Sequence, residues 1–265
     1  MTGLTDCHNH LQDPRLAGHA EEVLRDCRAA GVSELIVNGT RESDWPNVAA
    51  LARRFPGQVR ASYGLHPWYA AERSLDWGER LAGFLDGGAC GVGEAGLDRW
   101  IPGHDIVDQS AILTAQIAMA RERGLPLTLH CLQAWGVLLA LLERSSLPAR
   151  GFLLHSYGGS PEMVDGFVRL GAYFSFSGYF LRPGKEAKLE AFRRAPLDRL
   201  LVETDAPDMA LPPELERFHI RGENGKPVNH PANLPAVLEG LARLRGVGAG
   251  ELASAVAANC RRLFG

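Results

Sequence analysis

Eight short apolar runs, each followed by a segment with helical periodicity, constrain the fold of this chain more than any other feature. The runs predict strands over residues 4–11, 33–40, 59–66, 90–97, 126–131, 151–157, 171–179 and 200–204. The spacing of apolar residues predicts helices over 19–30, 42–55, 75–86, 106–124, 134–144, 161–170, 185–194, 232–244 and 250–263. This alternation is typical of an α/β protein. We therefore expect a (β/α)8 TIM-type barrel, with a doubly wound parallel sheet as the alternative.

The length of the chain fits one such barrel. It has 265 residues, so we expect a single barrel domain over residues 1–265. The doubly wound alternative is weakened because no Gly-x-Gly-x-x-Gly follows the first strand. One long irregular stretch, residues 207–231, follows the eighth strand and is placed to cover a site at that end.

Composition excludes several classes of protein. No apolar run reaches the roughly 18 residues of a membrane span, and the N-terminus lacks the pattern of a secretory signal. The five cysteines are scattered without a Cys-x-x-Cys pair, which favours reduced thiols and a cytoplasmic location. The net charge is −3, so any affinity for phosphate has to be local. The oligomeric state stays open.

The first strand ends in two histidines one residue apart, His8 and His10. Side chains alternate across a strand, so these two imidazoles point to the same side and can reach one metal ion. Taken alone, the pair fits a polar surface turn equally well.

Further metal-binding side chains end other strands. Glu94 lies late in the fourth, His130 ends the fifth, His155 ends the sixth, and Asp205 follows the eighth. In a barrel the carboxyl ends of all strands meet at one face. Singly, either histidine is more often a core residue, Glu94 fits an ion-pair partner, and Asp205 fits a turn former. Their equivalent positions favour a shared metal site.

Six ligands exceed what one catalytic zinc takes from a protein, so two ions roughly 3.5–4 Å apart fit better. We expect His8, His10 and Asp205 to hold one ion, His130 and His155 the other, and Glu94 to bridge them. Two divalent ions lower the pKa of a water between them. Asp205 can hold that water and accept its proton, so Asp205 and Glu94 are the predicted catalytic residues. Zn, Mg and Mn all remain candidates.

The motifs that carry these residues also form an ordered set along nearly the whole chain. They are Asp6-Cys-His8-Asn-His10, Gly64-Leu-His66-Pro67, Gly93-Glu94-Ala-Gly-Leu-Asp98, Leu129-His130, His155-Ser-Tyr-Gly-Gly159, Phe174-Ser-Phe-Ser-Gly178, Glu203-Thr-Asp205-Ala-Pro207 and Asn259-x-x-x-Leu263-Phe264. The set resembles the TatD family of metal-dependent deoxyribonucleases in the amidohydrolase superfamily. The resemblance implies a TIM-type barrel, divalent metals on the six ligands, hydrolysis of phosphoester bonds in DNA, and a place for His66 near the substrate rather than on the metals.

One feature separates this chain from other branches of that superfamily, and two depart from the family pattern. Many superfamily members bridge their metals with a carbamylated lysine, but here no lysine precedes Lys185, so Glu94 takes that place. Leu132 stands where the family usually has an arginine, and His230 stands where it usually has a glutamate, so two charged groups near the mouth are missing. Arginines in predicted loops either replace this charge or are ordinary surface: Arg15, Arg41, Arg99, Arg182 and Arg221.

Three functions follow from these observations. The first is metal-dependent hydrolysis of phosphodiester bonds in DNA or of small phosphoesters. The second is hydrolysis of a small carbonyl substrate such as a lactone or cyclic amide, which the missing arginine and the negative net charge favour slightly. The third is metal binding without catalysis.

Overall fold

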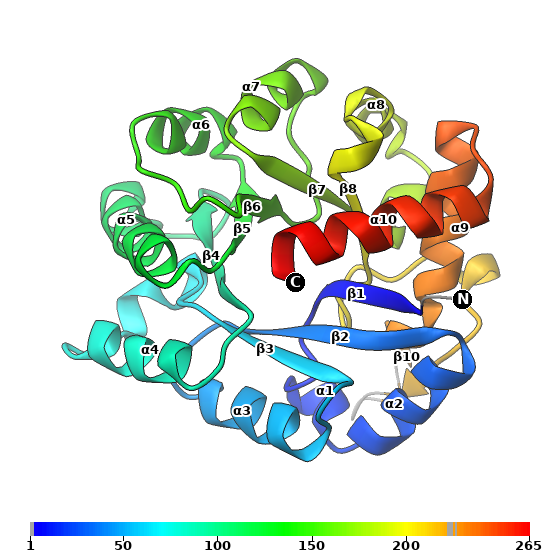
Figure 1. Cartoon of the computed structure of the whole chain (residues 1–265), viewed down its shortest axis with the longest axis horizontal. Helices are drawn as coiled ribbons and strands as arrows, with labels where there is room; N and C mark the ends of the chain where they lie inside the picture. The colour runs from blue at the N-terminus through cyan, green and yellow to red at the C-terminus, as the bar shows by residue number, and fades with distance from the viewer. Residues whose placement is uncertain (1–2, 222–224, 226) are drawn as a thin grey trace.

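The computed structural model describes residues 3–221, 225 and 227–265, and eight parallel strands in it form one barrel-like sheet (Figure 1). The strands are β1 (Leu4–Asn9), β2 (Val32–Gly39), β3 (Val59–Tyr63), β4 (Gly91–Asp98), β5 (Leu127–Leu132), β6 (Phe152–Leu154), β7 (Ala172–Ser177) and β8 (Leu200–Glu203). Their order in the sheet is their order in the chain. The (β/α)8 prediction is therefore confirmed, and the doubly wound alternative is wrong because it requires the strand order to reverse.

The first and last strands meet through a buried carboxylate. Asp6 of β1 is fully buried, and its side chain accepts hydrogen bonds from the backbone N–H (2.9 Å) and the hydroxyl of Thr204. One residue later, the N–H of Asp205 donates to the carbonyl of His8 at 3.0 Å. These bonds bring the ends of β1 and β8 together, and with them two of the predicted metal-binding segments.

Helices surround the barrel (Figure 1). They are α1 (Pro14–Ala17), α2 (Ala20–Ala29), α3 (Trp45–Arg54), α4 (Trp77–Asp86), α5 (Ile106–Arg123), α6 (Trp135–Glu143), α7 (Val164–Arg169), α8 (Glu186–Arg194), α9 (Leu234–Arg245) and α10 (Ala249–Phe264). Each buries apolar side chains such as Val23, Leu113 and Phe192 against the sheet. Burial of a side chain of this size contributes about 1.5–3 kcal/mol. No helix among the described residues is both long enough and apolar enough to cross a bilayer.

The last helix, α10, lies across one end of the barrel (Figure 1). Its residues Leu263 and Phe264 are buried in one cluster with Cys7, Ile36 and Leu201 of the strands. The carbonyl of Phe264 also accepts a hydrogen bond from Arg60, near the start of β3. This end of the barrel holds the starts of the strands, so the opposite end is left open for a site.

The predicted element boundaries mostly agree with the structure, and the sixth strand differs for a local reason. It covers only Phe152–Leu154 instead of residues 151–157. The chain turns away from the sheet at Ser156, whose φ of +41° is incompatible with a strand. Residues 161–170 begin as a short 3-10 turn, η2 (Pro161–Met163), before α7.

The irregular stretch 207–231 forms short elements. They are η5 (Pro213–Leu215) and an antiparallel pair of β9 (Ile220–Arg221) with β10 (Pro227–Val228), while residues 222–224 and 226 lie outside the described part of the chain. Of this stretch, Asp208 and Met209 border the cavity at the open end of the barrel. The remaining short turns are η1 (Pro67–Glu72), η3 (Gly178–Leu181), η4 (Leu197–Arg199) and η6 (Pro231–Asn233).

Candidate metal centre

A cavity of about 430 Å³ opens at the carboxyl ends of the strands. Five of the six predicted metal ligands line it, namely His10, Glu94, His130, His155 and Asp205. The sixth, His8, is fully buried and lies against the same side chains. The structure thus brings together all six residues, which are up to 197 positions apart in the chain.

Glu94 lies at the centre of this cluster, with one oxygen toward each of two groups of histidines. Its Oε2 atom is 3.4 Å from His8 Nε2 and 3.3 Å from His10 Nε2. Its Oε1 atom is 3.2 Å from His130 Nδ1 and 2.8 Å from His155 Nε2. A carboxylate in this position can contact two cations at once.

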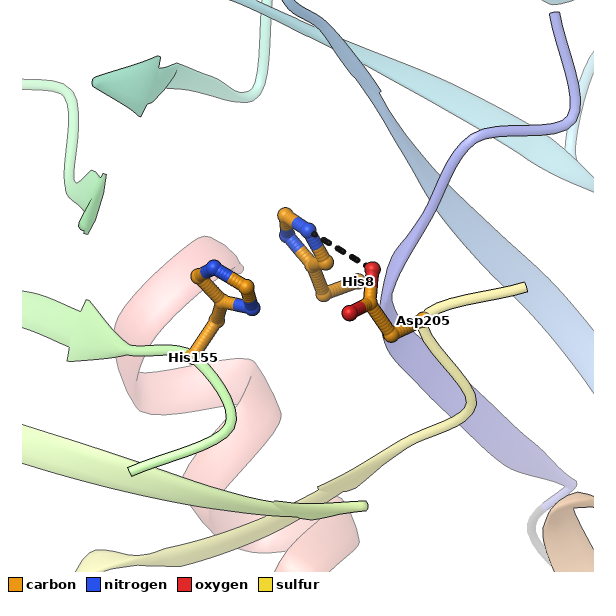
Figure 2. Close-up of side chains that lie close together, drawn as sticks. All are labelled: His8, His155 and Asp205. Atoms are coloured by element: carbon orange, nitrogen blue, oxygen red, sulfur yellow. Dashed lines mark ion pairs between the residues drawn. The ribbon is translucent and has the colours of Figure 1, made fainter. Parts of the chain in front are cut away.

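Asp205 completes the first group. Its Oδ1 atom is 3.5 Å from Nε2 of both His8 and His10. Figure 2 shows Asp205 and His155 reaching His8 from different segments, and the rings of His8 and His155 stack with centroids 4.1 Å apart. Asp205 has a φ of +53°, which is uncommon for residues with a side chain and is stabilised by surrounding contacts. The bond from its N–H to the His8 carbonyl is such a contact.

Close packing of two strands brings the two halves of the cluster together. Gly96 of β4 is opposite His130 of β5, with a φ of +151°. A Cβ atom at Gly96 would lie 1.9 Å from the His130 carbonyl oxygen. Only glycine permits this approach, so the Glu94-Ala-Gly96 sequence is what lets Glu94 and His130 converge.

The side chains fit divalent metal ions. Within the described residues, neither ring nitrogen of the buried His8 makes a hydrogen bond, although such atoms normally have a partner. His10 Nδ1 lies 2.9 Å from the carbonyl oxygen of Asn38, so this nitrogen carries the proton and the lone pair of Nε2 faces the cluster. Imidazole nitrogen and carboxylate oxygen together suit Zn, Mn and related ions.

The charges of the cluster are strongly coupled. Burial acts to raise the pKa of Glu94, but the histidines around it, led by His155, hold that pKa well below its usual range. Burial acts to lower the pKa of His10, and the carboxylates of Asp205 and Glu94 outweigh burial and raise it. His8 has a lowered pKa because burial and His155 both oppose its charged form. The carboxylates are therefore ionised and His8 is neutral, which are the forms that bind a cation. The raised pKa of His10 favours its charged form, so this ring has to release a proton before it can bind one.

Two buried carboxylates outside the predicted set lie beside the histidines. Asp98 Oδ2 lies 2.8 Å from His130 Nε2. Glu203 Oε1 lies 3.7 Å from His155 Nδ1 and accepts hydrogen bonds from the N–H and hydroxyl of Ser156 at 2.7 and 2.6 Å. A hydrogen-bonded acceptor such as Asp98 orients a ligand histidine in metalloproteins, whereas Glu203 is beyond hydrogen-bond distance of His155. Asp98 stands in a conspicuous motif, but its role depends on a contact that no spacing in the sequence reveals.

His66 also reaches the cluster, with its Nε2 atom 3.3 Å from Glu94 Oε1. Its other nitrogen, Nδ1, accepts a hydrogen bond from the N–H of Trp68 at 3.1 Å. The neutral ring therefore has its proton on Nε2, facing the cluster, which is the reverse of His10. Burial lowers the pKa of His66 to about 4, so this neutral form is present near pH 7.

The arginines considered from the sequence divide into two groups. Arg15 and Arg41 line the cavity. Arg15 is bound to Asp13 and Asp208 at 2.8–2.9 Å, whereas the guanidinium of Arg41 lies 4.5 Å above the ring of Tyr69. The others lie outside the lining of this cavity: Arg99 and Arg221, which are exposed, and Arg182, which donates to backbone carbonyls.

His230 does not lie at the mouth, contrary to the expectation from the sequence. It is buried, its Nδ1 accepts a hydrogen bond from the N–H of Ala232, and its Nε2 is 3.7 Å from Asp26 of α2. Residues after β10 turn away from the cavity, so a charge at this position would face the α2 helix. Leu132, in contrast, does lie at the end of β5 and is partly exposed.

Known proteins resemble this chain over its whole length. The model of the family described as TatD related DNase matches residues 5–265. The chain belongs to this family. The resemblance inferred from the motifs is thereby confirmed, together with its implication that the protein is a hydrolase.

Relatives of this TatD-family protein include one that is named an exonuclease and one that is named an uncharacterized hydrolase. The 3'-5' ssDNA/RNA exonuclease TatD of Erwinia tasmaniensis is 31% identical, over 96% of this chain and 97% of its own length. An uncharacterized metal-dependent hydrolase, YjjV of Escherichia coli, is 32% identical, over 98% and 96%. The crystal structure of YjjV superimposes with a TM-score of 0.89 at 30% identity, covering 98% of this chain and 97% of the other.

Proposed function

We propose that this TatD-family protein is a metal-dependent nuclease that cleaves phosphodiester bonds of single-stranded DNA with two divalent ions. The observation that carries the proposal is the position of Glu94, whose two oxygens face two separate groups of histidines. The name of the Erwinia relative supports a nucleic-acid substrate. We also propose that the chain forms a single barrel domain and is located in the cytoplasm. The five free, buried cysteines are compatible with a reducing compartment.

Each residue has a role in this proposal. His8, His10 and Asp205 would hold one ion, His130 and His155 the other, and Glu94 would contact both. Ions there would stabilise negative charge on the phosphate oxygens and lower the pKa of the attacking water. Asp205 would position that water and accept its proton, since its Oδ1 atom faces His8 and His10 and the carboxylate has a second oxygen for the water.

His66 contacts the substrate in this proposal rather than an ion. Its Nδ1 lone pair is occupied by the N–H of Trp68, so the ring presents an N–H donor to the cavity. A phosphate oxygen is a suitable acceptor for that donor. This agrees with the role that the family resemblance implies for His66.

The experiment compares wild type with Asp205→Asn, Glu94→Gln and the surface control Asp86→Asn, each reconstituted with Mg, Mn or Zn. We expect wild type to bind two ions and to cleave single-stranded oligonucleotides. Asp205→Asn should lower kcat by at least about a hundredfold. Asp86→Asn should behave as wild type, because the Asp86 side chain is 63% exposed and pairs with Arg123 at the surface. Absence of cleavage with all three metals would overturn the proposal.

A carbonyl substrate is the second candidate. Leu132 removes a positive charge from the end of β5 and is 38% exposed, which favours a less anionic substrate. The same proteins tested on lactones and cyclic amides decide between the two. Faster turnover of such a substrate than of any oligonucleotide would favour this candidate.

A further inference from the structure

Two exposed tryptophans form one surface at the rim of the metal centre. Trp68 is 46% exposed and lines the cavity, and Trp100 is 59% exposed. Their rings lie within 29° of parallel, with centroids 6.3 Å apart. Large aromatic side chains gain free energy from burial, so two of them exposed side by side indicate a binding surface. Trp68 and Trp100 are called the tryptophan platform below.

Asp98 fixes this platform relative to the metal centre. Its Oδ2 atom accepts a hydrogen bond from the indole N–H of Trp68 at 2.8 Å. Its Oδ1 atom accepts one from the backbone N–H of Trp100 at 2.6 Å. The same carboxylate contacts His130. The group that orients a predicted metal ligand therefore holds the ring of Trp68 and the backbone of Trp100, which places both residues beside the cluster.

The polar atom of Trp68 is already satisfied by Asp98, so the ring offers its apolar faces to a ligand. Leu132 adds a further apolar side chain to this rim. The N–H of Arg99 donates to the Leu132 carbonyl, which places Leu132 beside Asp98, and the Leu132 side chain is partly exposed. The rim beside Asp98 is thus largely apolar and aromatic, with the exposed Arg99 as a neighbouring cation.

We propose that Trp68 and Trp100 stack against unpaired nucleobases of the substrate strand next to the cleaved phosphate. Every base has a π-face, so stacking on indole provides affinity without sequence preference. Bases in a duplex are already stacked on each other, and the platform therefore favours single strands. This inference rests on the proposed nuclease function.

Binding of a strand that keeps its phosphates and lacks its bases tests the platform. Fluorescence anisotropy would give the Kd of metal-free protein for a thymidine oligonucleotide and for an abasic strand of equal length. We expect wild type to prefer the thymidine strand by about tenfold, the effect of one stacked base. In Trp100→Ala, which keeps Trp68, this preference should fall to about threefold or less, and in Trp100→Tyr it should largely return, because tyrosine keeps an aromatic face.

Trp100 is the better position for this test than Trp68. In the described part of the chain, Trp100 contributes a backbone N–H to the network around Asp98, and a side-chain substitution keeps that bond. Val107→Ala is the control, because Val107 is 76% exposed and belongs to the first turn of α5. An unchanged preference in Trp100→Ala, or an equal loss in Val107→Ala, would overturn the platform.

The outcome is separable from that of the nuclease proposal. Binding to metal-free protein does not depend on turnover. A protein that prefers the thymidine strand through Trp100 but cleaves no oligonucleotide would retain the platform and lose the nuclease activity. A protein that cleaves both strands equally well and binds them equally well would retain the activity and lose the platform.

Discussion

Asp98 Oδ2 lies 2.8 Å from His130 Nε2, so a buried carboxylate decides which nitrogen of this imidazole faces Glu94. Burial acts to raise the pKa of Asp98, but the hydrogen bonds from His130 and Trp68 outweigh burial and lower it to about 2. Asp98 is therefore an anion at any working pH. It holds the proton of His130 on Nε2 and leaves the lone pair of Nδ1 for a cation.

Asp98→Asn should weaken metal binding. The amide offers a single acceptor oxygen and no charge, so it cannot serve His130, Trp68 and the backbone of Trp100 together. We expect metal affinity and activity to fall about 10–100-fold, measured by calorimetric titration with Mn and by kcat. Asp105→Asn is the control, because Asp105 caps α5 through the N–H groups of Val107 and Asp108 and should affect stability only. Equal metal affinity in Asp98→Asn and wild type would contradict this role.

Much of the architecture was predictable because it follows from local periodicity. Alternation along β1 turns His8 and His10 to one side, and the parallel order of the strands delivers Glu94, His130 and His155 to the same end. Both inferences need only the period of a strand and the convergence rule of a barrel. The fold and the residues that meet in the cavity could therefore be predicted from the sequence.

The orientation of the histidine rings and the course of the loops could not be predicted from the sequence. The contact of Asp98 with His130 spans 32 residues, and nothing in either segment specifies it. The proton position of His66 depends on the N–H of Trp68 within the short turn η1, which the sequence did not predict. His230 was expected near the mouth, but the course of the chain after β10 turns it against α2. Each feature is set by tertiary contacts, which no local pattern records.

Gln116→Leu should destabilise the protein. The amide of Gln116, on α5, accepts from the N–H of Leu65 at 2.8 Å and donates to the carbonyl of Leu65 at 3.1 Å, and both residues are buried. Leucine would leave both backbone groups without a partner, at a cost of about 1–3 kcal/mol each. We expect the free energy of unfolding in urea to fall by about 2–4 kcal/mol. Thr114→Val, on the exposed side of α5, should change it by less than about 0.5 kcal/mol.

Removal of metal should lower the melting temperature. An ion that binds the folded chain at a hundred times its Kd stabilises the protein by about 2.7 kcal/mol. For a chain of this size, that corresponds to a shift of about 5–10 °C per ion. Scanning fluorimetry in EDTA and in excess Mn would measure the shift. Glu94→Gln should lose most of it, since Glu94 contacts both groups of histidines, while Asp86→Asn should keep it. A full shift in Glu94→Gln would exclude Glu94 as a ligand.

His230 should make the protein less stable in acid. Burial lowers the pKa of this histidine to about 4, with Asp26 and Glu22 acting to raise it and His219 acting to lower it. The unfolded chain takes up a proton near pH 6.5, its ordinary value, but the folded chain does so only near pH 4. The full contribution of His230 to stability is therefore present above about pH 6.5 and is lost as the pH falls toward 4.

The substitution His230→Asn isolates this effect, because the amide oxygen can still accept the hydrogen bond from the N–H of Ala232. The free energy of unfolding of wild type should fall between pH 6.5 and 4 more steeply than that of the variant, by up to about 1.4 kcal/mol per pH unit. The total difference should reach about 3 kcal/mol. His219→Asn is the control, because the His219 side chain is 53% exposed. Parallel curves for wild type and His230→Asn would show that buried carboxylates, rather than His230, govern the acid transition.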